Sequence, residues 1–210
     1  MKKLGLLAFA AVTGSAYGFN FDLSGGTGGA IPDGAGANTA GATLTITLNV
    51  SGNAGATIAS LDLAGILGLS HTWMGDLVAT LEHEGVVIDL MDRNYRTTTG
   101  GSGGNLILNG DYMFNEGGPN MTGATVPSGT YGRHANAGFG SSAATGTYAD
   151  LVGKPLDGDW ILRITDHWTA DTGNAGGLRI VGSANPPVPE PATLTVLGLG
   201  AFAALRRRRK

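Results

Sequence analysis

The chain has 210 residues, enough for one ordinary domain beside its terminal segments, and it contains no cysteine, which excludes disulfides, cysteine-based zinc sites and thiol nucleophiles. Its 37 glycines follow no three-residue period, which excludes collagen and favours many short β segments joined by turns. Residues 19–188 carry 15 Asp or Glu against 6 Lys or Arg, an acidic balance that excludes nucleic-acid binding and makes metal cations the more natural partners.

Residues 1–18 are predicted to form a secretory signal peptide. Lys2 and Lys3 provide the positive start, Leu4–Val12 the apolar stretch, and small residues lead to a cleavage site near Ala16 or Gly18. A buried helix is the alternative interpretation, but the three parts occur in the order that export requires. We therefore expect an exported protein.

Residues 19–185 are predicted to form one all-β domain, a β-sandwich of about eight strands. Thr43–Val50 alternates strictly between apolar and polar residues, as a half-buried strand does. Gly, Asn, Asp or Pro separates most of the candidate strands. The other candidates are Ile58–Leu63, Asp76–Glu82, Val86–Met91, Leu106–Leu108, Tyr112–Phe114, Trp160–Thr165 and Gly177–Val181.

Two distant blocks of this domain resemble the P domain (P/Homo B) of proprotein convertases. The first contains SHTWMGDL at 70–77 and LMDR at 90–93, and the second contains GKPLDGDWILRITD at 153–166 followed by DTG at 171–173. The resemblance spans residues 58–182 and implies a jelly-roll β-sandwich that usually follows and stabilises a subtilisin-like protease. Residues 19–57 leave no room for such a protease, so the accessory module stands here without the enzyme.

The P-domain resemblance also implies calcium, because bacterial members often bind it. The matching carboxylates are Asp76, Asp92, Asp166 and Asp171, and Ca²⁺ prefers six to eight oxygen ligands. Aspartates beside glycine also commonly cap turns with their own side chains, which is the alternative interpretation. The sequence leaves both open.

The tryptophans suggest a second kind of ligand, a sugar stacked on aromatic rings. Trp160 alternates with Leu162 and Ile164 and is therefore predicted to lie in the core, whereas Trp168 is the expected exposed contact. His83, in a predicted hairpin between Glu82 and Glu84, is expected to be exposed to solvent.

Gly100–Gly104 satisfies the pattern G-x-S-x-G around Ser102, but a nucleophile needs a strand-to-helix elbow with a histidine and an acid. This segment lies in a glycine-rich run before a predicted strand. We therefore expect no catalytic residue and no enzyme.

Residues 186–210 have three parts in order: a proline-rich linker, an apolar helix at 192–205 and a basic terminus. The 14 uncharged residues would rise about 21 Å as a helix, less than the roughly 30 Å of a bilayer core, and arginine stems can cover part of the gap. The tail resembles the PEP-CTERM sorting signal, and the alternative is a plain tail anchor. The residues that carry the resemblance are Val188, Pro189, Glu190, Pro191, Arg206, Arg207, Arg208 and Arg209.

The PEP-CTERM resemblance implies processing by an exosortase, a membrane-embedded enzyme, after transient anchoring in the inner membrane of a Gram-negative-type bacterium. We expect a non-catalytic, calcium-stabilised module at the cell surface or in the extracellular matrix. Two alternatives remain open, an accessory of a separately encoded subtilisin-like protease and a carbohydrate-binding module for exopolysaccharide.

Overall fold

The computed structural model describes residues 17–98, 100–133 and 140–187. Nearly all of the predicted signal peptide, the apolar helix at 192–205 and the sorting residues 188–210 lie outside these ranges. Within them, no helix has the length and apolar character of a membrane span.

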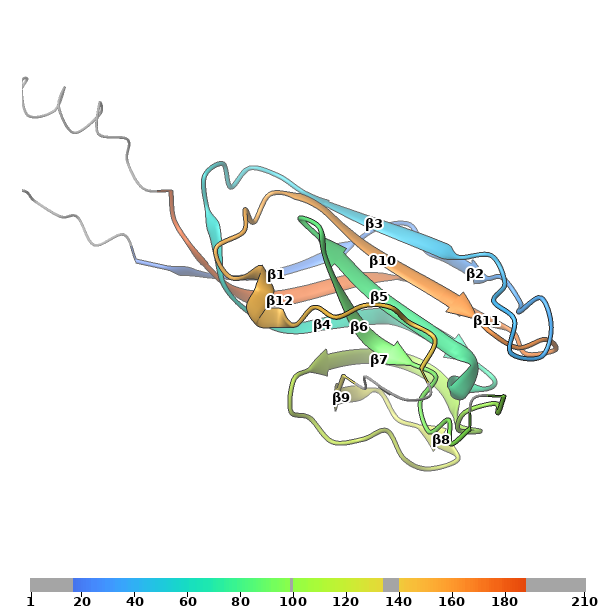
Figure 1. Ribbon diagram of the computed structural model, residues 1–210. Helices are drawn as coiled ribbons and strands as arrows, with labels where there is room; N and C mark the ends of the chain where they lie inside the picture. Colours follow the sequence, from blue (N-terminus) through green and yellow to red (C-terminus); the bar gives the residue numbers. More distant parts are fainter. Residues whose placement is uncertain (1–16, 99, 134–139, 188–210) are drawn as a thin grey trace, which may run out of the picture.

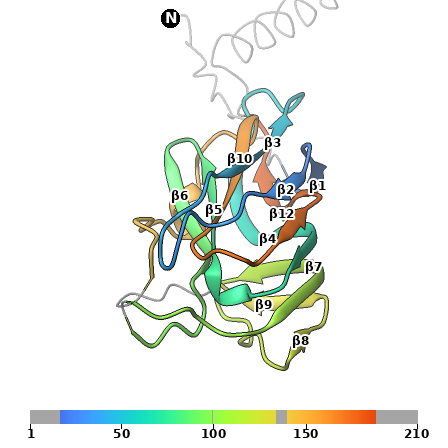
Figure 2. The same cartoon turned by 90° about the vertical axis from the view of Figure 1, so that its right-hand side faces the viewer.

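The described residues form two β-sheets, so the prediction of an all-β domain is confirmed (Figures 1 and 2). The larger sheet has the order β1-β12-β4-β11-β2; β7 pairs with β4, and β8 and β9 pair in parallel with β7. The smaller sheet has the order β3-β10-β5-β6.

The larger sheet comprises β1 (Phe19–Gly25), β2 (Gly29–Ile31), β4 (Thr57–His71), β7 (Ile107–Asn115), β8 (Thr125–Val126), β9 (Gly129–Gly132), β11 (Gly173–Ala175) and β12 (Gly177–Asn185). The smaller comprises β3 (Leu44–Val50), β5 (Leu77–His83), β6 (Val86–Asp92) and β10 (Gly158–Asp166), and two 3₁₀ turns are η1 (Met74–Asp76) and η2 (Tyr148–Leu151).

The core lies between the sheets and follows the period-2 pattern of the strands. Ile46 and Leu48 of β3 are buried while Thr45 and Thr47 face solvent, as the alternation predicts. Trp160 of β10 is fully buried with its alternate neighbours Leu162 and Ile164, which confirms its predicted place in the core.

β4 is much longer than the sequence predicts. The predicted strand Ile58–Leu63 extends to His71, because β12 on one side and β7 on the other supply pairing partners along its whole length. Gly68, with a φ of 57°, sits where the pairing with β7 shifts register between Ile66 and Leu69. Glycine permits such a bulge, because it adopts a positive φ without steric cost.

His83 is buried, so the expectation that it faces solvent is wrong. Its ring stacks on Trp160 with a centroid distance of 3.9 Å and an interplanar angle of 6°. Nδ1 lies 3.0 Å from the carbonyl oxygen of Asp159 and Nε2 lies 2.8 Å from that of Pro155. Both contacts come from residues more than 70 positions away, which the local sequence does not reveal.

The sandwich has two distinct ends. At one, β1 begins and β12 ends, since Phe19 pairs with Ala184 and Thr57 pairs with Asn185; residues 51–56, 84–85 and 152–158 complete this tail-side pole (Figure 1). At the other, β4 ends at His71, opposite Gly173. There η1, the ends of β6 and β10 and residues 93–98 and 100–106 form the polar pole.

Candidate functional site

The polar pole gathers an unusual number of buried ionisable side chains. His71 ends β4, Asp76 ends η1, Asp166 ends β10, and Asp92 and Arg93 lie at the end of β6. All five are buried, and Asp76, Arg93 and Asp166 are 0% exposed. Because charged residues are seldom fully buried without partners, this cluster is the strongest candidate for a site or for a structural network.

Arg93 joins three chain segments at this pole. Its Nε donates to the carbonyl oxygen of Gly75 at 2.8 Å, Nη1 donates to Asn38 Oδ1 at 3.1 Å, and Nη2 donates to the carbonyl oxygen of Gly101 at 3.2 Å. Nη2 also lies 3.7 Å from Asp76 Oδ1. The guanidinium therefore connects the loop at 33–41, η1 and residues 100–104 to the end of β6.

Asp76 is the least satisfied member of the cluster. Neither of its carboxylate oxygens has a hydrogen-bond partner, and its contact with Arg93 is a charge interaction alone. Burial raises the pKa of Asp76 from 3.8 to about 6, and the nearby Asp166 and Asp171 act in the same direction, against the positive charge of Arg93.

Asp166 and His71 connect the two loops that carry the partly exposed tryptophans. His71 Nε2 donates to Asp166 Oδ2 at 3.1 Å, and His71 Nδ1 lies against the backbone of Trp73. The other oxygen, Asp166 Oδ1, accepts the backbone N–H of Trp168 at 2.9 Å. Residues of the two sequence blocks, which are about 95 positions apart, thus meet directly.

The remaining predicted ligands, Asp92 and Asp171, hold loops. Asp92 Oδ1 accepts the backbone N–H groups of Ser141 at 2.6 Å and Ser142 at 3.2 Å. Asp171 Oδ1 accepts the Thr72 hydroxyl at 2.7 Å. These contacts are of the turn- and loop-capping kind that the sequence left open as the alternative to calcium.

The four aspartates lie at one pole but do not form a ready calcium cage. Among the described residues, no group of three or more His, Asp or Glu side chains could hold a metal ion. The two carboxylate oxygens of Asp76 have no hydrogen-bond partner, but the positive guanidinium of Arg93 lies beside them and would repel a cation. Calcium also needs six to eight oxygen ligands. The present donor set fits the ion poorly, and calcium binding stays a prediction.

Trp73 and Trp168 are both half-buried at the polar pole. Trp73 Nε1 donates to the carbonyl oxygen of Gly103 at 3.4 Å. The indole N–H of Trp168 has no acceptor among the residues that the structure describes. Trp168 is therefore less exposed than predicted, yet its polar edge is available to a ligand.

Ser102 lies between two structural contacts, since the carbonyl oxygens of Gly101 and Gly103 accept hydrogen bonds from Arg93 and Trp73. Within residues 17–98, 100–133 and 140–187, no hydrogen bond joins Ser102 to a histidine or a carboxylate. The G-x-S-x-G segment thus supplies backbone acceptors to the side chains of Arg93 and Trp73.

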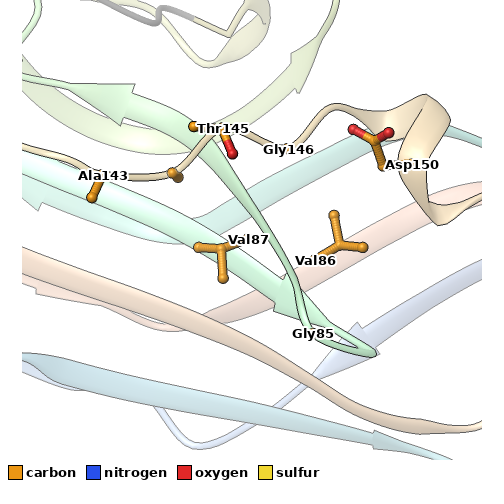
Figure 3. Close-up of a pocket in the computed structure, with 8 residues that line it drawn as sticks. Gly85, Val86, Val87, Ala143, Thr145, Gly146 and Asp150 are labelled. Atoms are coloured by element: carbon orange, nitrogen blue, oxygen red, sulfur yellow. The ribbon is translucent and has the colours of Figure 1, made fainter.

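An open groove of about 540 Å³ runs beside β6 (Figure 3). The backbone N–H of Gly146 donates to the carbonyl oxygen of Val87 at 2.9 Å, which brings residues 143–146 alongside this edge strand. Among the lining residues the ionisable one is Asp150, which caps η2 by accepting from Thr147. The lining residues are Gly85, Val86, Val87, Ala143, Ala144, Thr145, Gly146 and Asp150.

Comparison with known families identifies the tail. Residues 187–210 match the family described as "PEP-CTERM protein-sorting motif", which confirms the motif predicted from Val188–Pro191 and Arg206–Arg209. The match implies an exported protein of the Gram-negative cell envelope that an exosortase processes. No curated protein matches the chain.

We expect Arg93→Met to lower the free energy of unfolding by about 3–5 kcal/mol, because it leaves the buried Asp76 carboxylate without a positive neighbour. Asp76→Asn should have a smaller effect, since Arg93 keeps its three hydrogen-bond acceptors. Urea unfolding at neutral pH measures both. Adding Asp76→Asn to Arg93→Met should recover part of the loss; equal losses in the single and double variants would contradict the ion pair.

The raised pKa of Asp76 predicts a pH dependence of stability. Between the unfolded value of 3.8 and the folded value of about 6, the native state binds this proton and the unfolded chain does not, so the stabilisation is lost as the pH rises through 6. The melting temperature of the wild type should therefore fall relative to that of Asp76→Asn between about pH 4 and pH 7. A constant difference would show that Asp76 is ionised throughout.

Proposed function

We propose that this chain is an exported, exosortase-sorted protein whose β-sandwich is a non-catalytic binding or structural module at the cell surface or in the extracellular matrix. The observation that carries the proposal is the match of residues 187–210 to the sorting motif. The predicted signal peptide at the other end of the chain supports the same route.

The physical properties of the tail suit transient anchoring. Its proline-rich start cannot continue a helix or join a central strand, so it separates the domain from the apolar stretch. The uncharged segment of 14 residues is shorter than a helix needs to be to cross the bilayer core, and the arginines at 206–209 act as a cationic stop on the cytoplasmic side. A segment that is held weakly in the membrane in this way is suited to removal from the folded domain by a processing enzyme.

The P-domain-like identity of the sandwich is part of the proposal. It is supported by the meeting of its two sequence blocks at the polar pole, where His71 bonds Asp166 and Arg93 faces Asp76. These contacts join loops rather than expose reactive groups. Their arrangement favours a module that presents a fixed surface, and calcium stabilisation of that surface would appear as a rise in melting temperature with added Ca²⁺.

A carbohydrate-binding module is the second candidate, and the free indole N–H of Trp168 favours it. Trp73 and Trp168 are half-buried at one pole, and the His71–Asp166 pair fixes the loops that carry them. Rigid aromatic side chains with one free polar edge suit sugar stacking. The accessory role beside a separately encoded protease stays a prediction without a contact that favours it.

The sorting proposal predicts that a variant with Pro189, Glu190 and Pro191 all changed to alanine keeps its tail and stays in the membrane fraction. The wild type should lose the tail and move to the surface or matrix fraction. Mass spectrometry of the fractionated full-length chain measures this, with the exposed Asp22→Asn as the control. Export of the intact wild-type chain with its tail attached would contradict exosortase sorting.

The carbohydrate candidate predicts that Trp168→Ala weakens binding to exopolysaccharide by about tenfold or more, the effect of removing one central aromatic contact. Affinity electrophoresis of residues 19–185 in gels that contain purified exopolysaccharide measures the change. The neighbouring Thr169→Ala is the matched control. Unchanged retention of Trp168→Ala would exclude this surface as the sugar site.

A further inference from the structure

The two processed ends of the chain leave the sandwich side by side. β1 begins at Phe19, which pairs with Ala184, and β12 ends one residue later at Asn185. Paired residues of antiparallel strands lie about 5 Å apart. β1 therefore begins, and β12 ends, at the tail-side pole (Figure 1).

The connection from the folded domain to the sorting motif is short and stiff. Between Asn185, the last residue of β12, and Pro189 stand Pro186, Pro187 and Val188. Four residue steps in a polyproline conformation cover about 12 Å, and adjacent prolines restrict bending. The motif therefore cannot move far from the pole unless β12 itself unpairs.

The pole is also held firmly in place. Asp157 accepts the backbone N–H of Asn53 at 2.8 and 3.0 Å and its side-chain amide at 2.9 Å, and this joins residues 51–56 to residues 152–158. His83 bonds the carbonyl oxygens of Pro155 and Asp159 from a third element. With three elements joined in this way, the pole moves as a unit with the sandwich.

The link itself runs against this pole. A Cβ atom placed on Gly55 would come within 3.0 Å of Pro187 Cβ, so the proline lies on the loop at 51–56. An enzyme that binds the motif is therefore close to the surface of the tail-side pole beside the link. The charged residues on this surface are Glu84, Lys154, Asp157 and Asp159. This surface is acidic overall, and we expect basic or hydrogen-bond-donating groups on a partner that covers it.

We propose that the tail-side pole is the surface that docks on the membrane-embedded processing enzyme while the tail is removed. The proposal rests on the exosortase sorting proposed above. A link of about 12 Å is no longer than the radius of gyration of a 100-residue domain, about 13 Å, so it holds the folded sandwich within contact distance of an enzyme that binds the motif. The polar pole lies at the other end of β10, about 26 Å away along that strand, and faces outward in that complex.

The test compares two substitutions that place the same side chain, an exposed arginine, at opposite ends of the sandwich. Ala54→Arg lies beside the link, and Thr169→Arg lies at the polar pole. Each is made in the full-length chain with its native link and with a flexible spacer of about 12 Gly and Ser residues between Asn185 and Pro186, which reaches about 20 Å. Pulse-chase labelling in a bacterium that carries the processing enzyme measures the rate of tail removal.

With the native link, Ala54→Arg should slow removal about tenfold, the effect of disturbing one central interface contact, and Thr169→Arg should leave the rate unchanged. With the spacer, both should be cut at the wild-type rate. Equal rates for the two variants with the native link would overturn the docking surface while leaving sorting intact. Failure of the wild type to lose its tail with either link would overturn sorting, and this inference with it.

Discussion

A guanidinium group without access to water must have its donors met by protein oxygens, and at the polar pole this requirement falls on Arg93. The oxygens come from Asn38, Gly75 and Gly101, which belong to three loops of different origin. Each loop must therefore adopt the conformation that presents its oxygen, or the buried charge is left uncompensated. One side chain thus imposes the arrangement of a region that contains little regular structure and much glycine.

The same constraint explains what the motif residues do. Asp76 faces the guanidinium, Asp166 bonds His71, and Asp92 and Asp171 hold neighbouring loops. Carboxylates engaged in this way give the pole a fixed shape, which is valuable for a module that recognises a surface. Asp76 differs from the other three, because neither of its buried oxygens has a hydrogen-bond partner and its contact with the guanidinium is a charge interaction.

Features encoded by adjacent residues could be predicted from the sequence, and features encoded by distant contacts could not. The alternation of Thr43–Val50 and the placing of Trp160 in the core follow from period-2 patterns, and the sorting tail follows from three local segments in order. The burial of His83 depends on Trp160, and the full length of β4 depends on pairing with β7 and β12. The sequence motifs single out the four aspartates. Whether their oxygens remain without hydrogen-bond donors depends on distant loops, such as residues 141–142, whose N–H groups bond Asp92.

The pairing of the first strand with the last has a consequence for the order of folding. Among the described strands β1 pairs with β12, and Phe19 and Ala184 are 184 − 19 = 165 positions apart. Contacts of such high sequence separation form late, because a long loop must close first. A chain that emerges from a secretion channel with its N-terminus leading cannot complete this sheet until the C-terminal strand has also crossed. The pairings of β12 with β1 and β4 are therefore made only after the last strand has crossed, and they complete the larger sheet.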